Sequence, residues 1–237
     1  MPNLFMRSAN SNPKLKKLVT IVFLFLFLVL ACQFFISSIL IVRPEQEITH
    51  WETSKMPIDS AQAYTIGSRL ERAERLSFLP FQLKDTSKIN ELYSRLYLAL
   101  SLIENPKSNL ELAELHAIKL TQAAPSNYLG WTLLAQSKIY KDNYTWEDQS
   151  ALTKALTLAP FERKNQIRLL PLVIENWLLL SNKNQELTLE LIGSALNDPS
   201  TDHIAAGYMR EFDNIIPFNP LIDNSPLSGR IRRMLKQ

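Results

Sequence analysis

The chain has 237 residues, of which 26 are basic, 23 are acidic and only five are glycine. Its one cysteine is Cys32, so residues 43–237 contain neither a thiol nucleophile nor a cysteine ligand for zinc. Residues 1–17 hold four of the basic side chains and no acidic one, so the positive charge does not indicate nucleic-acid binding. Sheets need many turns that are rich in glycine, and this composition therefore predicts an all-α protein.

An uncharged apolar run extends from Leu18 to Val42. A helix of this length measures about 37 Å, which is enough to cross a hydrocarbon core of about 30 Å. Basic residues favour the cytoplasmic side, and the basic tail at residues 1–17 therefore predicts that residues 43–237 lie in the bacterial periplasm. The sequence predicts a single-pass inner-membrane protein, with the membrane itself as one partner.

Two alternative interpretations of this run stay open. A cleaved signal peptide has an apolar region of about 7–15 residues that ends in small residues, whereas this run continues past Ala31 without an A-x-A pattern. A lipoprotein signal would use Cys32, but the mature chain would then begin with ten further, mostly apolar residues. In the transmembrane interpretation, Cys32 is a small apolar residue within the helix.

The remaining elements follow from apolar periodicity and from proline. Pro44 is expected to stop the first helix, which makes residues 43–59 a tether. Apolar residues then recur at steps of three and four, and breaks such as Pro80 and Asn105-Pro106 separate the segments. The predicted helices are 60–77, 86–103, 108–124, 127–140, 146–159, 161–181, 184–197 and 200–213. Residues 214–237 form a proline-rich and basic tail, predicted to be extended over 214–228, with a final amphipathic turn or two.

A period of 34 residues runs through part of this helical segment. An aromatic residue, a leucine and a small residue recur at this step, as in the first helix of a tetratricopeptide repeat, and prolines terminate the second helices. The repeat-packing residues are Tyr97, Leu100 and Ser101, then Trp131, Leu134 and Ala135, with Pro125 and Pro160 as terminators. A third repeat is degenerate, because Gln166 takes the aromatic position. The pattern predicts a tetratricopeptide-like solenoid over residues 60–213, and a generic helical bundle is the alternative.

No catalytic arrangement is evident along the chain. The three histidines, His50, His116 and His203, are far apart, and motifs for zinc proteases, serine hydrolases and phosphate loops are missing. We therefore expect no enzyme activity, no metal, no cofactor and no small-molecule ligand. A cryptic enzyme is the remaining alternative, and a pocket with converging titratable groups would favour it.

The inner face of the predicted solenoid is the candidate binding site. Such a groove, lined by the first helix of each hairpin, binds an extended peptide or a partner helix. Its candidate residues are Arg95, Leu98, Leu102, Leu129, Thr132, Gln136, Lys164, Ile167 and Arg168. The alternative is that these are ordinary solvated helix residues. The basic end, residues 230–236, is a second candidate surface for lipid phosphates or an acidic polymer.

The layout of anchor, tether and degenerate repeats carries Ala124-Pro125 and Ala159-Pro160-Phe161-Glu162-Arg163. It resembles the VpsP family of polysaccharide biosynthesis proteins, which occur in exopolysaccharide gene clusters of marine gammaproteobacteria. The resemblance extends to about residue 182. It implies a membrane-anchored, non-catalytic scaffold that organises envelope proteins for exopolysaccharide biosynthesis or export. The alternative is an assembly or chaperone-like factor that binds an extended client in secretion or cytochrome maturation.

Overall fold

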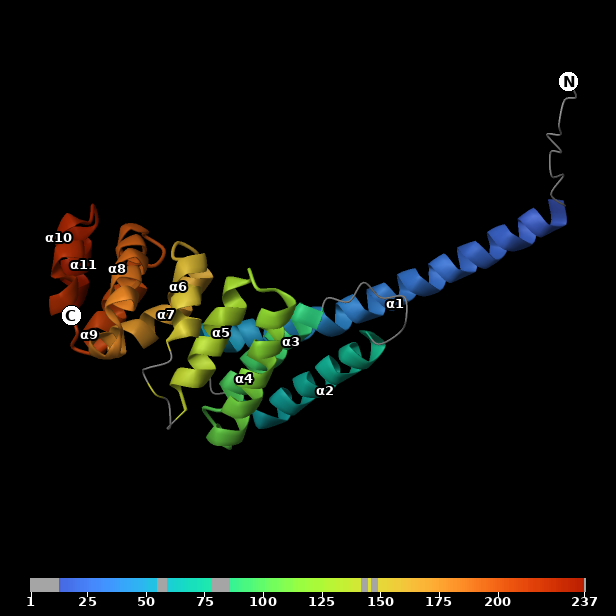
Figure 1. The fold of residues 1–237 in the computed structure, drawn as a ribbon, viewed down its shortest axis with the longest axis horizontal. Coiled ribbons are helices and arrows are strands. Elements are labelled where there is room, and N and C mark those ends of the chain that lie inside the picture. Colours follow the sequence, from blue (N-terminus) through green and yellow to red (C-terminus); the bar gives the residue numbers. More distant parts are fainter. Residues whose placement is uncertain (1–12, 55–58, 78–85, 142–144, 146–148, 237) are drawn as a thin grey trace, which may run out of the picture.

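The computed structural model describes residues 13–54, 59–77, 86–141, 145 and 149–236, and all regular secondary structure within them is helical. This confirms the predicted all-α class. Figure 1 shows the helices following one another in chain order along the long axis, with α1 projecting at one end. The elements are α1 (Pro13–Ser54), α2 (Ser60–Ser77), α3 (Thr86–Leu100), α4 (Pro106–Ala123), α5 (Tyr128–Ile139), α6 (Ser150–Leu158), α7 (Arg163–Glu175), η1 (Trp177–Leu179), α8 (Asn182–Asn197), α9 (Asp202–Glu211), η2 (Ile216–Phe218), α10 (Asn219–Asn224) and α11 (Ser228–Leu235).

Helices α2 to α9 correspond to the predicted helical segments. Local signals explain several of their ends: Asn105 adopts a left-handed conformation with φ 43° before Pro106, and the Asn127 side chain caps α5 by accepting from the Leu129 amide. Among these helices, the largest difference is at the predicted helix 161–181, because α7 ends at Glu175 and a 3-10 turn follows. Pro80 lies outside the described residues.

Helix α1 continues through Pro44, where we expected it to stop. The predicted tether, residues 43–59, is instead helical as far as Ser54, and residues 55–58 lie outside the described part. Pro44 is buried, and the next turns bury Ile48 and Trp51 against α2 and α3. This packing offsets the hydrogen bond that proline removes from a helix.

The apolar run from residue 18 to 42 is therefore not an element of its own but the longer part of α1, and many of its side chains are exposed. Among the residues that the structure describes, no helix meets both the length and the apolar character that crossing a membrane requires. The predicted transmembrane helix, and with it the inner-membrane localisation and the periplasmic placement of the domain, are corrected by this finding. Residues 1–12 of the basic tail lie outside the described part.

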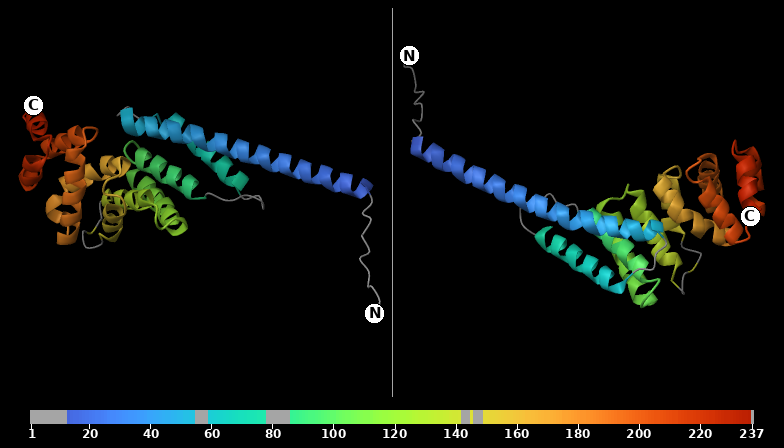
Figure 2. Two further views of the ribbon diagram at one scale, coloured as in Figure 1. Left: turned by 90° about the horizontal axis from the view of Figure 1, so that it is seen from above. Right: turned by 180° about the vertical axis from the view of Figure 1, so that it is seen from behind.

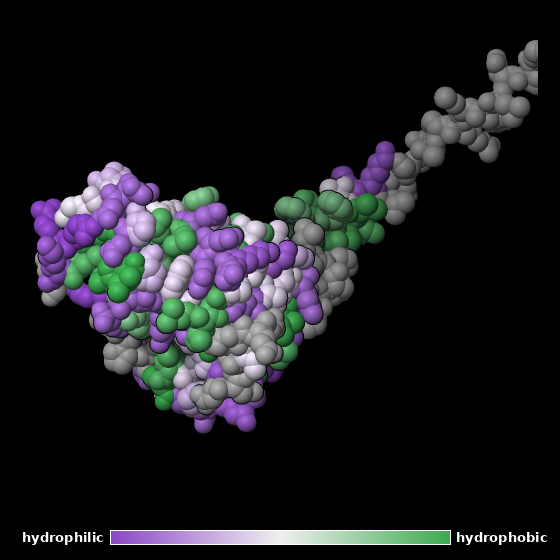
Figure 3. Space-filling model, turned by 60° about the vertical axis from the view of Figure 1, so that its left-hand side comes forward, coloured by the Kyte–Doolittle hydropathy of each residue, from purple (hydrophilic) through white to green (hydrophobic). Residues whose placement is uncertain are grey.

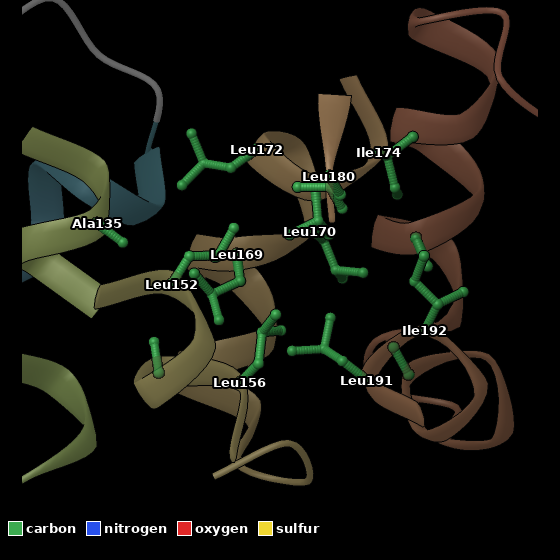
Figure 4. Close-up of a cluster of buried hydrophobic side chains, with 14 of the residues drawn as sticks. Ala135, Leu152, Leu156, Leu169, Leu170, Leu172, Ile174, Leu180, Leu191 and Ile192 are labelled. Atoms are coloured by element: carbon green, nitrogen blue, oxygen red, sulfur yellow. The ribbon is translucent and has the colours of Figure 1, made fainter. Parts of the chain in front are cut away.

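Two clusters of buried apolar side chains hold the helices together. The smaller cluster joins the end of α1 to α2 and α3, and Tyr97 packs against both clusters. The larger cluster continues from α3 to α11. Figure 4 shows its centre, where α5, α6, α7 and α8 contribute Ala135, Leu152, Leu156, Leu169, Leu170, Leu191 and Ile192. The core thus runs along the whole row of helices that Figure 1 displays.

The turns that follow α4 and α6 have the same form. Ala124 and Ala159 end the two helices with φ, ψ of −140°, 77° and −153°, 62°. Three residues later, Asn127 and Glu162 begin the next helices in the extended region, with φ of −76° and −78°. In each turn the later residue's amide donates to the alanine carbonyl, at 3.0 and 3.4 Å. The Ala-Pro pairs therefore produce one turn geometry twice.

A side-chain hydrogen bond back to each turn repeats as well, four residues after Asn127 and after Glu162. Trp131 Nε1 donates to the carbonyl of Pro125 at 2.8 Å, and Gln166 Nε2 donates to the carbonyl of Pro160 at 3.1 Å. Gln166 thus makes the hydrogen bond of the aromatic residue that it replaces. The hydrogen bond to the proline carbonyl is therefore present in both turns, although the aromatic residue is not.

The C-terminal segment differs most from its prediction. Residues 214–228 are not extended: Pro217 and Pro220 lie in the first turns of η2 and α10, where proline's missing amide costs nothing. Figure 2 shows α10 and α11 closing the far end of the row of helices. The basic end forms α11, which packs on α9 and buries Ile231 completely.

Candidate partner-binding face

Three of the predicted groove residues come together on the first helices of successive pairs. Arg95 lies on α3, Gln136 on α5 and Arg168 on α7. The Arg168 guanidinium donates to Gln136 Oε1, and the Gln136 amide donates back to the Arg168 carbonyl, both at 3.4 Å. We call the surface formed by these three residues the arginine face.

The other predicted groove residues have different surroundings. Leu98 and Thr132 are buried, and Thr132 donates to Asn165 Oδ1 at 2.5 Å inside the helix pack. Leu129 is partly buried against the core. Leu102, Lys164 and Ile167 are exposed. The predicted groove residues therefore do not form one continuous surface. Their charged part is the arginine face.

Equivalent residues of the predicted repeat-packing set have similar burial. Leu100 and Leu134 are buried to the same degree, with 6% exposure each, and Ser101 and Ala135 are buried beside them. Tyr97 and Trp131 are half-buried against the core. Pro125 and Pro160 occupy the two matching turns.

The arginine face is occupied by α1. Arg95 donates two hydrogen bonds to the Glu52 carboxylate, from Nε to Oε1 at 3.0 Å and from Nη2 to Oε2 at 2.6 Å. Its Nη2 also donates to the Thr49 hydroxyl at 2.8 Å. Arg168 Nη2 donates to the same Glu52 Oε1 at 2.5 Å. One carboxylate therefore joins α1, α3 and α7. Sequence spacing placed both arginines on this face but gave no signal for Glu52, because it is 116 residues from Arg168.

Two further acids on the same part of α1 are paired. Glu45 accepts from Lys88 on α3 at 2.6 Å, and Glu47 accepts from Arg69 on α2 at 2.9 Å. Glu91 on α3 completes the network by accepting from Lys88 and Arg95. We call residues 45–52 the acidic segment. Each of its three carboxylates contacts a base on another helix.

The electrostatics of this network favour the charged forms. Burial alone would raise the pKa of Glu52, but the hydrogen bond from Arg95 and the charge of Arg168 outweigh it and hold that pKa below its ordinary value. Burial would lower the pKa of Lys88, but its hydrogen bond to Glu45 and the charge of Glu91 raise it overall. Glu52 and Lys88 are therefore held in their charged forms in the neutral range.

A cleft of about 530 Å³ opens between α1 and α2. Glu47, His50 and Arg69 are among its lining residues, and Glu47 and Arg69 neutralise each other across it. Within the described part of the chain, no group of three metal-ligating side chains is close enough to hold an ion. The cleft thus presents paired charges beside the acidic segment.

His116, which has no ligand-type neighbour on its own helix, finds a partner on α3. Its Nδ1 donates to Asn90 Oδ1 at 2.8 Å, and its ring stacks on Tyr93 with the centroids 4.6 Å apart. Tyr97 stacks on Tyr93, with the ring centroids 6.0 Å apart. Burial and the charge of Lys119 lower the pKa of His116 to about 4. The ring is a neutral packing element between α3 and α4.

The basic C-terminal residues are not a free tail. Arg230 Nε lies 3.0 Å from Asp202 Oδ2, a carboxylate that is completely buried at the start of α9, and Arg232 pairs with Asp223. Arg210 donates to the carbonyl of Met234 at 3.0 Å. These contacts, with Ile231, make α11 the cap of the helical row. The predicted surface for lipid phosphates or an acidic polymer is therefore partly used for packing.

Comparison of the chain with known protein families, with curated proteins and with solved structures found no match. Functional inference therefore depends on the chain's own geometry. Figure 3 shows that the visible surface of the helical domain is largely hydrophilic, with apolar residues in separate small groups. The most specific arrangement for recognition is the arginine face.

Proposed function

We propose that this chain is a tetratricopeptide-like helical scaffold, without catalytic activity, that binds a partner protein on its arginine face. The pairs α3–α4, α5–α6 and α7–α8 would be its repeating hairpins. The scaffold would serve as an accessory protein in exopolysaccharide biosynthesis or export. Repeat scaffolds bring partners together by offering one face over several hairpins.

The observation that carries the proposal is the repeated turn. Ala124-Pro125 and Ala159-Pro160 share backbone angles and amide hydrogen bonds, and Trp131 and Gln166 close them with equivalent side-chain bonds. A coincidental bundle has no reason to repeat such details 35 residues apart. Hairpins joined by identical turns stack in register, which brings their first helices side by side. Consistent with this, α3 packs on α5, and α5 packs on α7.

The assignment to exopolysaccharide biosynthesis is supported by the resemblance of the repeats to the VpsP family. The face itself supports binding to protein rather than chemistry on a sugar. Two arginines converging on one carboxylate make a site for an acidic side chain, since guanidinium matches a carboxylate in planar, bidentate geometry. A scaffold of this kind would hold an acidic segment of a protein partner.

A site-specific photo-crosslinker tests the proposal in cells. Placed at Lys164, which is exposed near the arginine face on α7, it should form crosslinks to a protein of exopolysaccharide assembly. Placed at Glu190, exposed on α8, it should not. Loss of the chain should also lower exopolysaccharide yield. Crosslinks to secretion or haem-lyase proteins would instead support the client-binding alternative, and an unchanged yield would contradict the assigned pathway.

A further inference from the structure

The arginine face has an occupant within the same chain. The end of α1 packs on α3 (Figures 1 and 2). The Glu52 side chain accepts from both Arg95 on α3 and Arg168 on α7. The Arg95 side chain is 7% exposed, and the Arg168 side chain is 16% exposed. A guanidinium so buried requires a carboxylate, because an unpaired buried charge is costly. The Glu52 carboxylate is therefore the anionic group that the two arginines share, and Glu91 is a second counter-charge of Arg95.

The acidic segment has the form of a bound helical ligand. Ile48 and Trp51 are its apolar anchors, with 0% and 8% exposure. Glu45, Glu47 and Glu52 lie around them and pair with bases on three other helices. Apolar anchors at helical spacing with flanking charges are the way an amphipathic helix binds a groove.

We propose that residues 45–52 are an intramolecular ligand of the arginine face, and that the partner protein presents an acidic amphipathic helix to the same two arginines. This inference rests on the proposed scaffold function. The partner helix carries a carboxylate where Glu52 now lies, so that it replaces one Arg–carboxylate contact by another. Exchange of like for like leaves no arginine unpaired, and the partner competes by its concentration and its additional contacts.

The two arginines also define the partner's chemistry. A carboxylate-bearing helix fits the distances at Glu52, where both carboxylate oxygens accept from Arg95. A basic or neutral helix would remove the carboxylate that Arg95 and Arg168 share, and would leave Arg95 with Glu91 on its own helix as its counter-charge. The partner segment is therefore acidic on one side and apolar on the other, like residues 45–52 themselves.

The test uses the full chain and a fluorescein-labelled peptide of its own residues 43–54 as the probe. Weak binding is expected to the wild type, whose face is occupied. The variants Glu52→Gln and Glu52→Lys weaken the internal contact, and both should bind the peptide at least about tenfold more tightly. Adding Arg168→Gln to either variant should remove this gain, and a peptide with glutamine at position 52 should not bind. Helical circular dichroism of every variant provides the folding control.

Two results would overturn the intramolecular ligand: equal peptide binding by the wild type and both Glu52 variants, or binding that ignores Arg168→Gln. The two proposals fail in different ways. If peptide binding depends on Arg168 but exopolysaccharide yield is unchanged when the chain is lost, the internal ligand is supported and the assigned pathway is contradicted. If exopolysaccharide yield requires Arg168 but the Glu52 variants do not bind the peptide, the scaffold function is supported and the internal ligand is contradicted.

Discussion

At the scale of single residues, buried polar side chains fix how the helices meet. Asn165 is completely buried, and its amide donates to the carbonyls of Ala155 and Ala159 while its oxygen accepts from Thr132. These carbonyls lie at the end of α6, where a helix leaves backbone acceptors unsatisfied. One side chain therefore closes α6 and connects it to α5 and α7.

His116 predicts a specific pH dependence of stability. Because burial and Lys119 lower its pKa to about 4, the folded chain resists a proton that the unfolded chain accepts below about pH 6.5. The free energy of unfolding should therefore have its full value above about pH 6.5 and should decrease as the pH falls towards 4. Urea unfolding should show a loss of about 1 kcal/mol between pH 7 and pH 5, after allowance for partial exposure. His116→Gln should reduce this loss. An unchanged loss in His116→Gln would contradict the account.

Gly130 predicts a steric cost. A Cβ at this position on α5 would lie 2.9 Å from Leu120 Cγ and 3.3 Å from Thr121 Cγ2 on α4, closer than packed atoms allow. Gly130→Ala should lower the free energy of unfolding by about 1–3 kcal/mol. Gly207→Ala on α9 is the matched control, because its Cβ would meet nothing within 4 Å, and alanine should stabilise that helix by up to about 1 kcal/mol. Equal effects in chemical denaturation would contradict a close approach of α4 and α5.

The element scale shows where local rules succeed and where packing overrides them. The Ala-Pro pairs and Asn105-Pro106 predicted helix ends correctly, because proline and a left-handed asparagine act within the local backbone. Pro44 was predicted to end α1 and does not, since tertiary contacts of Ile48 and Trp51 outweigh its local cost. Pro217 and Pro220 suggested an extended tail, although proline also suits the first turn of a helix. Whether a proline ends, continues or begins a helix depends on tertiary contacts, which the spacing of residues in the sequence does not reveal.

The last helix, α11, predicts that the C-terminus stabilises the whole row. Ile231 is completely buried in the large cluster, so Ile231→Ala should lower the free energy of unfolding by about 2–4 kcal/mol. Arg233→Ala, at an exposed site on the same helix, should change it by less than about 0.5 kcal/mol. Thermal denaturation of the two variants distinguishes a packed cap from a solvated tail. Similar melting temperatures would indicate the solvated tail.

At the scale of the whole molecule, the acidic segment determines what the arginine face can do. Sequence periodicity predicted the helices and placed Arg95, Gln136 and Arg168 on one face. It did not predict that the end of α1 covers that face, because Glu52 reaches Arg168 only through the packing of α1 on α2 and α3. The same reliance on the sequence alone led to the incorrect assignment of residues 18–42 as an anchor.

The most direct measurement is the distance between α1 and α7 in solution. Spin labels on cysteines at Gln46 and Lys164, both exposed, in a chain with Cys32→Ser, report this distance by pulsed electron resonance. The wild type should give one narrow distribution at neutral pH, and Glu52→Lys should broaden it by repelling both arginines. Because the pKa of Glu52 is lowered, the narrow distribution should persist well below pH 7 and broaden only as the pH falls through that pKa. A distribution that is equally narrow in the wild type and in Glu52→Lys would contradict the claim that Glu52 holds α1 on the arginine face.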